Sequence, residues 1–261
     1  MDGISVQNLH VAYGAKTVID GLNVGIPAGK VTTVIGPNGC GKSTMLKAVG
    51  QLIESSGQIL LDGTDIRSLS RKKLATRLAM LPQSPTSPEG LLVKDLVGRG
   101  RHPHQSWFKQ WSSTDQDAVA EALAQTGSVE LADRAVHELS GGQRQRVWIS
   151  MVLAQRTPVM FLDEPTTYLD LSASIDVLNL VRRLNSELGR TVVMVLHDLN
   201  LAARYSDHLL VLRDGMLKAE GPPADVITSP LLREVFDLEA LVEEDPAVGG
   251  PLIIPAAPEK E

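Results

Sequence analysis

The sequence predicts an α/β protein: a parallel β-sheet covered by helices, preceded by an antiparallel β region and interrupted by an inserted helical lobe. Two observations lead to this prediction. Short apolar, β-branched runs such as residues 31–35 and 192–196 alternate with segments of helical spacing, and such alternation is typical of a parallel sheet covered on both faces. Hydrophobic residues make up 43% of the 261 residues, enough to bury one compact core with a lobe attached.

The first third of the chain reads mainly as strands and turns. Residues 4–14 and 17–29 resemble strands, and the apolar run 30–36 is a buried strand that ends in glycine. A helix is predicted over residues 42–49, with Gly50 suited to its end. The stretch 57–66 then predicts a hairpin that turns at Asp62-Gly63.

The middle of the chain is predicted to be mainly helical. After a strand-like run at residues 78–82, residues 87–157 predict a mostly helical lobe. We expect a polar loop over residues 98–117, a capped helix over 114–127 and a further helix from Ser140 to about Arg156.

Strands and helices alternate again towards the end of the chain. The predicted elements are strands at 158–165 and 191–198, helices at 172–188 and 199–207, and a hairpin at 208–221. We therefore expect one domain over residues 1–230, with a core of 1–86 and 158–230 and a helical subdomain of 87–157. Residues 231–261 form a proline-rich extension, whose last five residues we expect to be frayed.

Composition excludes several classes of function. The net charge of −6 disfavours broad contact with nucleic acid, although Arg99, Arg101, His102 and His104 form a small basic patch. The single cysteine, Cys40, permits no intrachain disulfide and fits a reducing compartment. No apolar run approaches the roughly 18–20 residues that span a bilayer, and the start has no signal-peptide pattern. We expect a soluble protein whose membrane role, if any, comes through a partner.

Residues 36–43, GPNGCGKS, match the phosphate-binding pattern G-x-x-x-x-G-K-S/T. The match follows a predicted buried strand and opens a helix, so backbone N–H groups and the helix dipole would converge on phosphates. Lys42 would bind the β- and γ-phosphates, the Ser43 hydroxyl would hold Mg²⁺, and Thr44 would add a phosphate contact. The sequence therefore predicts a P-loop NTPase fold with a nucleotide site formed by Gly36, Pro37, Asn38, Gly39, Cys40, Gly41, Lys42, Ser43 and Thr44.

Polar residues at the ends of other strands extend this prediction. Asp163 ends the run VMFLD and would hold Mg²⁺ through a water, while Glu164 would face the opposite way, free to polarise an attacking water as general base. Gln83 would reach both Mg²⁺ and that water. His197 alone would more often be structural, but its place at a strand end in a P-loop sheet favours contact with the nucleotide. Tyr13 either stacks on an adenine ring or simply packs.

A second candidate phosphate cradle is the motif LSGGQ, residues 139–143, at the start of a predicted helix. Two glycines there would leave backbone N–H groups pointing outward, which suits an anion. The alternative is an ordinary capped helix.

The P-loop, Gln83, LSGGQ, FLDEP, YLD and His197 in this order resemble the ATP-binding subunit of an ABC transporter, over about residues 1–230. The resemblance implies a head-to-tail homodimer bound to membrane permease subunits, with a substrate-binding protein as an indirect partner. It also implies that one copy's signature residues grip the γ-phosphate held by the other copy's P-loop. These are Ser140, Gly141, Gly142 and Gln143, with Asp170 in the loop along the interface.

Several stretches resemble one branch of that family, the ATPases that power import of iron chelates. They include residues 195–215 (VLHDLNLAARYSDHLLVLRDG) and the tail EEDPAVGGPLIIP, residues 243–255, and the likeness is greatest to the ferric-enterobactin type. This implies an ATPase on the cytoplasmic face of the membrane that uses ATP and Mg²⁺. A heme or vitamin B12 cargo is the alternative, and a non-transport ABC ATPase of DNA repair or translation is a rival. His102 and His104 make a poor metal site because no carboxylate or thiol cluster accompanies them.

Overall fold

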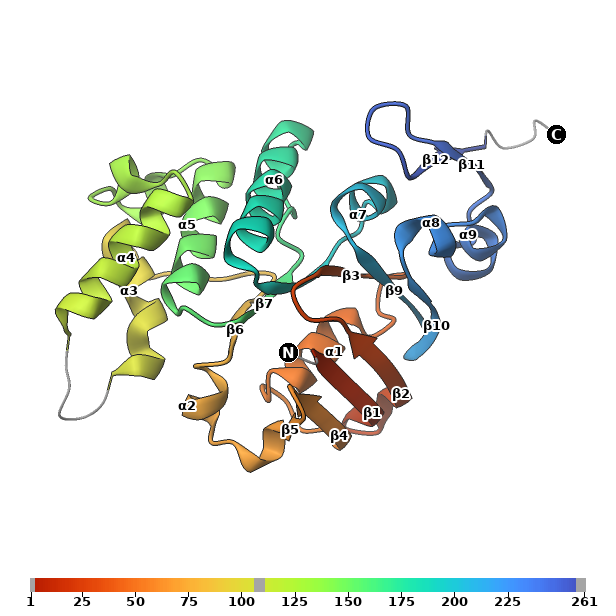
Figure 1. The fold of residues 1–261 in the computed structure, drawn as a ribbon, viewed down its shortest axis with the longest axis horizontal. Helices are drawn as coiled ribbons and strands as arrows, with labels where there is room; N and C mark the ends of the chain where they lie inside the picture. Colours follow the sequence, from red (N-terminus) through yellow and green to blue (C-terminus); the bar gives the residue numbers. More distant parts are fainter. Residues whose placement is uncertain (1–2, 106–110, 257–261) are drawn as a thin grey trace. The chain divides into compact units, whose positions relative to one another are not determined.

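A computed structural model describes residues 3–105 and 111–256 (Figure 1). The chain forms two compact units, one from residues 1–67 with 193–261 and the other from residues 68–192. These units do not coincide with the core and helical subdomain expected from the sequence, whose boundaries remain a prediction. The expected fraying of residues 257–261 lies outside the described residues.

The first unit contains an antiparallel sheet with the strand order β2-β1-β4-β5 (Figure 1). The predicted hairpin is confirmed, because Asp62 and Gly63 both have left-handed backbones, with φ of 48° and 73°, as a two-residue hairpin turn requires. The strands are β1 (Ile4–Tyr13), β2 (Lys16–Ile26), β4 (Ser56–Leu61) and β5 (Thr64–Asp65).

The same unit carries buried parallel strands. β3 (Val31–Ile35) pairs in parallel with β9 (His208–Arg213), which pairs antiparallel with β10 (Met216–Gly221). All residues of β3 and of β8 (Thr191–Val195) are buried, which explains their continuous apolar runs. β8 carries the chain from one unit to the other. Helices α1 (Lys42–Val49) and α7 (Leu199–Tyr205) follow β3 and β8.

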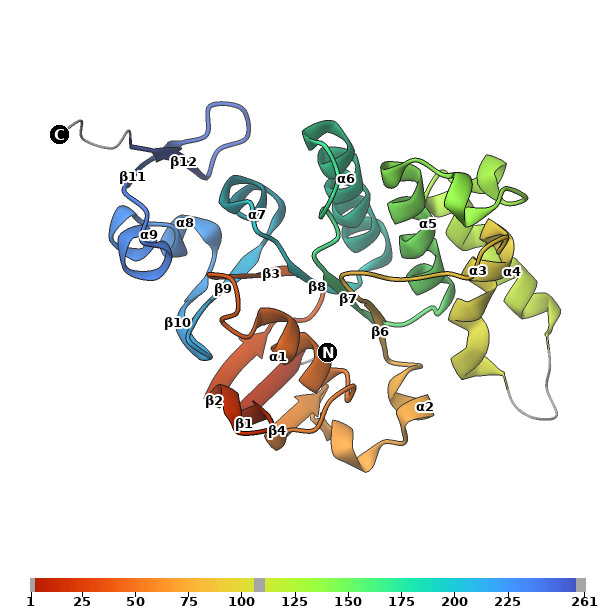
Figure 2. The same cartoon turned by 180° about the vertical axis from the view of Figure 1, so that it is seen from behind.

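The C-terminal segment is more ordered than the predicted extension. Two short helices lead into an antiparallel hairpin that the sequence analysis missed, since PLIIP gave no alternating pattern (Figure 2). These elements are α8 (Pro223–Val226), α9 (Ser229–Phe236), β11 (Ala240–Glu244) and β12 (Pro251–Pro255).

The second unit combines a parallel strand pair with a group of helices. β6 (Leu78–Leu81) pairs in parallel with β7 (Val159–Asp163). Helices α3, α4 and α5 pack against one another, and α5 also packs on α6 (Figure 2). The helices are α2 (Arg71–Leu74), α3 (Val93–Gly98), α4 (Ser113–Gln125), α5 (Gly141–Ala154) and α6 (Leu171–Leu188), with 3₁₀ turns η1 (Ile66–Ser68), η2 (Arg99–His104), η3 (Val129–Leu131) and η4 (Val136–Glu138).

The prediction of a polar loop over residues 98–117 is wrong at both ends. Residues 99–104 continue α3 as the 3₁₀ helix η2, and α4 begins at Ser113 behind a capping box of Ser112 and Asp115. Arg101 is also wrongly placed in a basic patch, because it is only 4% exposed. Its Nε donates to Asp115 at 2.9 Å and its guanidinium donates to the Ala154 carbonyl at 2.7 Å, so the arginine joins η2, α4 and α5.

Candidate nucleotide site

The P-loop lies between β3 and α1 and has a backbone that only glycine can adopt. Gly36 and Gly41 have φ of 151° and 106°. A Cβ atom at Gly36 would lie 2.1 Å from the carbonyl oxygen of Leu212, so a side chain there would displace the neighbouring strand β9. The loop is therefore fixed in its tight turn by the packing beneath it.

Lys42 is the charged centre of this loop. The side chain is 5% exposed, and its Nζ donates to the carbonyl oxygens of Gly36 and Pro37, both at 2.8 Å. The loop thus wraps around its own cation at the N-terminus of α1, where the helix dipole adds further positive potential. This arrangement favours an anionic ligand.

The remaining loop residues fit a magnesium nucleotide. Asn38 and Gly39 are exposed, and the hydroxyl-bearing Ser43 and Thr44 are half-buried in the first turn of α1. Glycine N–H groups, a lysine and two hydroxyls form the donor set that a Mg²⁺-bound triphosphate needs. Cys40 is buried, and burial raises the pKa of its thiol despite the opposing effect of nearby Lys42, so this side chain packs as a neutral group.

Tyr13 and His197 belong to the same unit as the P-loop. Tyr13 ends β1 and is 49% exposed, so its ring is accessible to a ligand. His197 is exposed just beyond β8. The next residue, Asp198, caps α7 by accepting a hydrogen bond from the Leu201 N–H at 2.9 Å. Both sequence-predicted residues therefore stand at the ends of strands.

The carboxylates at the end of β7 belong to the second unit. Asp163 and Glu164 are 1% and 8% exposed, and Glu164 has a left-handed backbone with φ of 54°, which is uncommon outside glycine. Its Oε2 accepts hydrogen bonds from Gln83 Nε2 at 2.6 Å and from Thr167 Oγ1 at 2.9 Å. The sequence analysis expected this carboxylate to be free, but in the structure it accepts two hydrogen bonds. Two residues predicted for the site, Gln83 and Glu164, are therefore in contact. Thr167, which lies three residues after Glu164 and which the sequence analysis missed, donates to the same oxygen and orients it.

The signature motif forms the N-terminus of α5. Ser140 Oγ accepts from the Gln143 N–H at 3.3 Å, and Gln143 Oε1 accepts from the Ser140 N–H at 3.1 Å. This capping box confirms the predicted helix start. It also leaves the N–H groups of Gly141 and Gly142 with no acceptor inside the helix.

A cavity of about 280 Å³ lies against this helix end. Asp170 borders the cavity and caps α6 by accepting from the Ala173 N–H at 2.7 Å, so two helix N-termini face one space. Helix N-termini carry positive potential, and Arg146 adds a charge, so the cavity suits an anion. The lining residues are Ser140, Gly141, Gly142, Gln143, Arg146, Tyr168, Leu169, Asp170 and Ala173.

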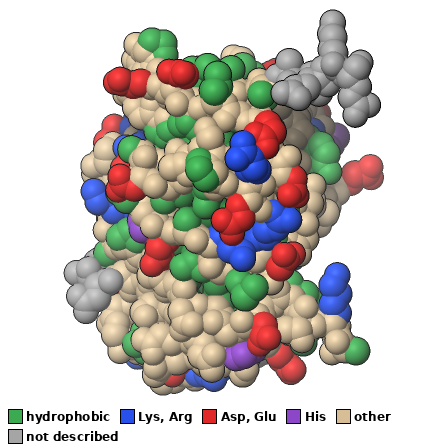
Figure 3. All heavy atoms as spheres, turned by 90° about the vertical axis from the view of Figure 1, so that its right-hand side faces the viewer, with side chains coloured by type: hydrophobic (Ala, Val, Ile, Leu, Met, Phe, Trp, Pro, Cys, Tyr) green, Lys and Arg blue, Asp and Glu red, His purple; other side chains and the backbone are tan. Residues whose placement is uncertain are grey.

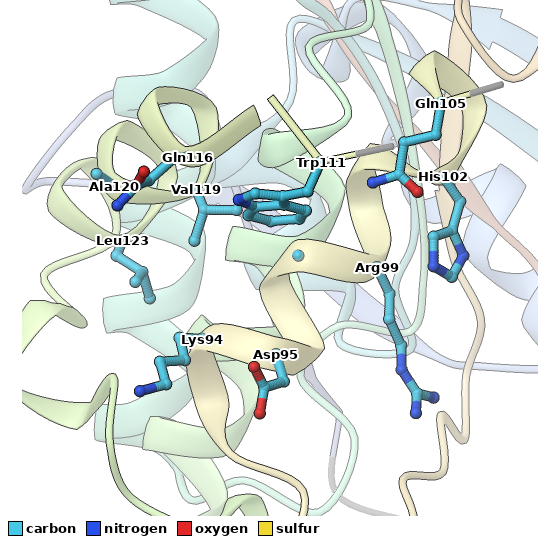
Figure 4. A pocket seen from close by; sticks show the side chains of 11 residues that line it. Lys94, Asp95, Arg99, His102, Gln105, Trp111, Gln116, Val119, Ala120 and Leu123 are labelled. Carbon is cyan, nitrogen blue, oxygen red and sulfur yellow. The ribbon is translucent and has the colours of Figure 1, made fainter. Parts of the chain in front are cut away.

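A larger cavity of about 710 Å³ lies among α3, η2 and α4 (Figure 4). Its apolar part includes Trp111, Val119 and Leu123, while Arg99 and His102 extend from η2. The imidazole Nε2 of His104 lies 2.7 Å from the Gln155 carbonyl instead of lining this cavity. The two histidines therefore have different surroundings.

A glycine-rich phosphate loop after a buried strand, together with acidic residues that end a parallel strand, defines the class of P-loop nucleotide hydrolases. Within that class the chain belongs to the ABC transporter family, which it matches over residues 19–167. The predicted fold class and family are confirmed, and the chain is the ATP-hydrolysing subunit of a transport system. Among the described residues, no helix combines the length and apolar character needed to cross a membrane.

Individual relatives agree with this assignment. The chain is 50% identical to a petrobactin import ATP-binding protein of Bacillus anthracis, over 97% of this chain and 93% of the relative. It is 47% identical to the ferric enterobactin transport ATP-binding protein of Escherichia coli (strain K12), over 95% and 92%. Its fold is similar to an ABC transporter in an inward-facing conformation (TM-score 0.86, 29% identity, 98% of both chains). It is also similar to a dimeric ATP-binding cassette bound to ADP and phosphate (TM-score 0.71, 27% identity, 84% and 98%).

Proposed function

We propose that this chain binds and hydrolyses ATP on the cytoplasmic face of the cell membrane to power import of an iron-siderophore complex through separate permease subunits. The observation that carries the ATPase part is the P-loop wrapped around the buried Lys42, in a chain that also has an anion-suited cavity at the signature helix. The siderophore cargo is supported by relatives of about half identity that import petrobactin and ferric enterobactin.

In this proposal each site residue has a defined role. Lys42 and the glycine N–H groups bind the phosphates, Tyr13 stacks on adenine, and His197 contacts the γ-phosphate. Ser43, Gln83 and Asp163 would hold Mg²⁺, which neutralises phosphate charge when bound.

Glu164 acts as the general base that takes a proton from the attacking water. The 2.6 Å hydrogen bond from Gln83 Nε2 to its Oε2 orients the carboxylate, and Gln83 would also be one of the residues that hold Mg²⁺. Thr167 Oγ1 donates to the same oxygen at 2.9 Å and orients the carboxylate from the following turn.

A second copy of the chain completes the nucleotide site in this proposal. The signature residues Ser140 and Gly141 are exposed, and Tyr168 beside them is 94% exposed with a left-handed φ of 64°. An exposed aromatic residue in an uncommon backbone conformation is explained if it packs against a partner. The signature of one copy would then bind the γ-phosphate held by the other, with Asp170 in the interface loop.

The permease would contact the cavity among α3, η2 and α4 (Figure 4). An apolar floor with Trp111 and Val119, and cationic side chains of Lys94 and Arg99 at its edge, suit a short amphipathic segment of a membrane subunit. The substrate-binding protein would act on the permease and reach this chain only indirectly.

Nucleic acid is not a partner in this proposal. The net charge is −6, and the face seen in Figure 3 carries acidic, basic and apolar side chains interspersed, without a continuous basic surface among the described residues. Nucleic-acid binding selects continuous basic surfaces. A non-transport role in DNA repair or translation is therefore disfavoured.

Growth of a strain that lacks this gene tests the function. With a ferric siderophore as the iron source, the wild-type chain should restore growth and Lys42→Ala should not. If the chain restores growth only with heme, or restores only cobalamin-dependent growth, the cargo is that chelate and not a siderophore. Cobalamin is a relevant alternative because a cobalamin import ATP-binding protein of Halobacterium salinarum is 40% identical over 97% of this chain and 63% of the relative. Recovery with ribosomes or DNA, without any uptake defect, would contradict a transport role.

A further inference from the structure

The C-terminal hairpin of β11 and β12 is attached to the first turn of α7 (Figure 1). Asn200 Nδ2 donates to the Ile253 carbonyl at 3.1 Å, and the Ile253 N–H donates to Asn200 Oδ1 at 2.8 Å. The side-chain amide thus satisfies both backbone groups of Ile253, as a neighbouring strand would. Asn200 is the second residue of α7 and lies three positions after His197.

The rest of the contact supports a fixed attachment. Ile253 is 4% exposed, and β12 packs on α7. Arg204, in the last turn of the helix, forms an ion pair with Asp245 of the hairpin at 3.3 Å. The hairpin therefore spans α7 from its first turn to its last.

The C-terminal end of α7 is held by the sheet as well as by the hairpin. Just beyond its C-terminal end, Ser206 Oγ lies 2.5 Å from Thr33 Oγ1 of β3, and the Asp207 carboxylate accepts from the Val31 N–H at 2.8 Å. That end is fixed to the sheet. The N-terminal end, which carries His197, has its cap at Asp198 and the hairpin contact at Asn200.

Two stretches that resemble the iron-chelate branch meet at this contact. Asn200 belongs to the stretch 195–215, and Ile253 belongs to the tail 243–255. They are 53 residues apart in the chain, and the structure joins them by two hydrogen bonds.

We propose that Asn200 is a positioning residue for ATP hydrolysis, through which the C-terminal hairpin holds the first turn of α7 and thereby the backbone at His197. The proposal rests on the proposed contact between His197 and the γ-phosphate. A displacement of about 1 Å of a group in the site can cost up to about 10²-fold in rate, so loss of this attachment should lower turnover while nucleotide binding by the P-loop persists.

Steady-state ATP hydrolysis by full-length variants tests the proposal. Asn200→Ala should lower kcat about tenfold and change KM for ATP less than about twofold. Asn200→Asp keeps the acceptor for the Ile253 N–H but sets a carboxylate oxygen against the Ile253 carbonyl, so it should also lower kcat; it covers the case in which the alanine variant does not fold. Ile254→Ser is the matched control, because Ile254 follows Ile253 in β12 but is 43% exposed; its kcat should equal that of wild type.

A double variant separates positioning from general loss of structure. If Asn200 acts through His197, Asn200→Ala should cause no further loss of kcat in a His197→Ala chain. Independent, multiplicative losses would overturn the positioning role alone, as would an Asn200→Ala chain with wild-type kcat. Full activity of His197→Ala would overturn this proposal together with the proposed role of His197, so the two failures can be told apart.

Discussion

The P-loop and the signature motif both place backbone N–H groups at a helix N-terminus, but they differ in how completely the surrounding residues enclose that end. At the P-loop the cation is buried, bonded to two carbonyl oxygens of its own loop, and flanked by glycines with left-handed backbones, of which Gly36 leaves no room for a Cβ atom. At the signature, Ser140 and Gly141 are exposed beside an open cavity, next to the almost fully exposed Tyr168.

This difference indicates two kinds of binding site. The P-loop is shaped before any ligand arrives, which lowers the cost of ordering it on binding. The signature has a firm helix cap, but Ser140 and Gly141 stay exposed among the described residues of its unit. An incomplete site of this kind is expected where a second molecule supplies the remainder.

The largest expected effect is that of changing Glu164, the proposed general base, whose carboxylate lies in neither phosphate cradle. Glu164→Gln should lower kcat by about 10²–10⁴-fold, because the amide cannot accept a proton from water. ATP affinity should remain near that of wild type, since the P-loop is unchanged. Phosphate release and equilibrium binding of a fluorescent ATP analogue measure the two quantities. Turnover within about threefold of wild type would exclude Glu164 as the general base.

Only the surface at the signature site is expected to be incomplete, whereas the interior of the same unit should be stable by itself. Arg101 and Asp115 form a buried ion pair there. Arg101→Met should lower the free energy of unfolding by about 3–5 kcal/mol, since it leaves the Asp115 carboxylate buried without its cation. Lys94→Met is the matched control, because the Lys94–Asp133 pair is exposed and should contribute little. Chemical denaturation compares the variants, and equal stabilities would contradict the account.

The same ion pair predicts a pH dependence. Burial alone would raise the pKa of Asp115, but hydrogen bonds from Ser112 and Arg101 lower it to about 2. The native state therefore holds the proton less tightly than the unfolded chain, and this contribution is present above about pH 4 and is lost as pH falls towards 2. An Asp115→Asn chain should lose less stability over that interval than wild type does; parallel pH curves would show that Asp115 does not contribute.

Lys42→Ala should weaken ATP binding about 10–100-fold, because it removes a charged hydrogen-bond donor worth about 1.5–3 kcal/mol. Lys47→Ala, in the last turn of the same helix, is the control and should bind ATP as wild type does. Fluorescence titration gives both dissociation constants. Unchanged affinity of the Lys42 variant would show that the preformed loop is not the phosphate site.

The smallest effect concerns the cap of the signature helix. Ser140→Ala should lower the free energy of unfolding by only about 1 kcal/mol, the usual contribution of an N-cap, because the cap bonds lie at the surface. Ser186→Ala, an exposed site on α6, should change it less. A loss of several kcal/mol would mean that this motif serves the fold more than a ligand.

The sequence predicted structure best where the residues that form a feature are neighbours in the chain. The P-loop and the start of a helix at Ser140 could be predicted because their geometry depends on neighbours within a few positions. Burial of Arg101 could not, because it depends on α4 and on the Ala154 carbonyl, 53 residues further along. The same holds for the hydrogen bond between Gln83 and Glu164 and for the docking of the C-terminal hairpin on α7, which join residues far apart in sequence.

The central claim is that two copies of the chain must meet to complete a nucleotide site. Sedimentation of Glu164→Gln with Mg-ATP tests it most directly, because slow hydrolysis preserves the ATP-bound state. The account predicts a shift from the 28.1 kDa of one chain to twice that mass, reversed when ATP is omitted. A species that retains ATP yet sediments as a single chain would contradict it.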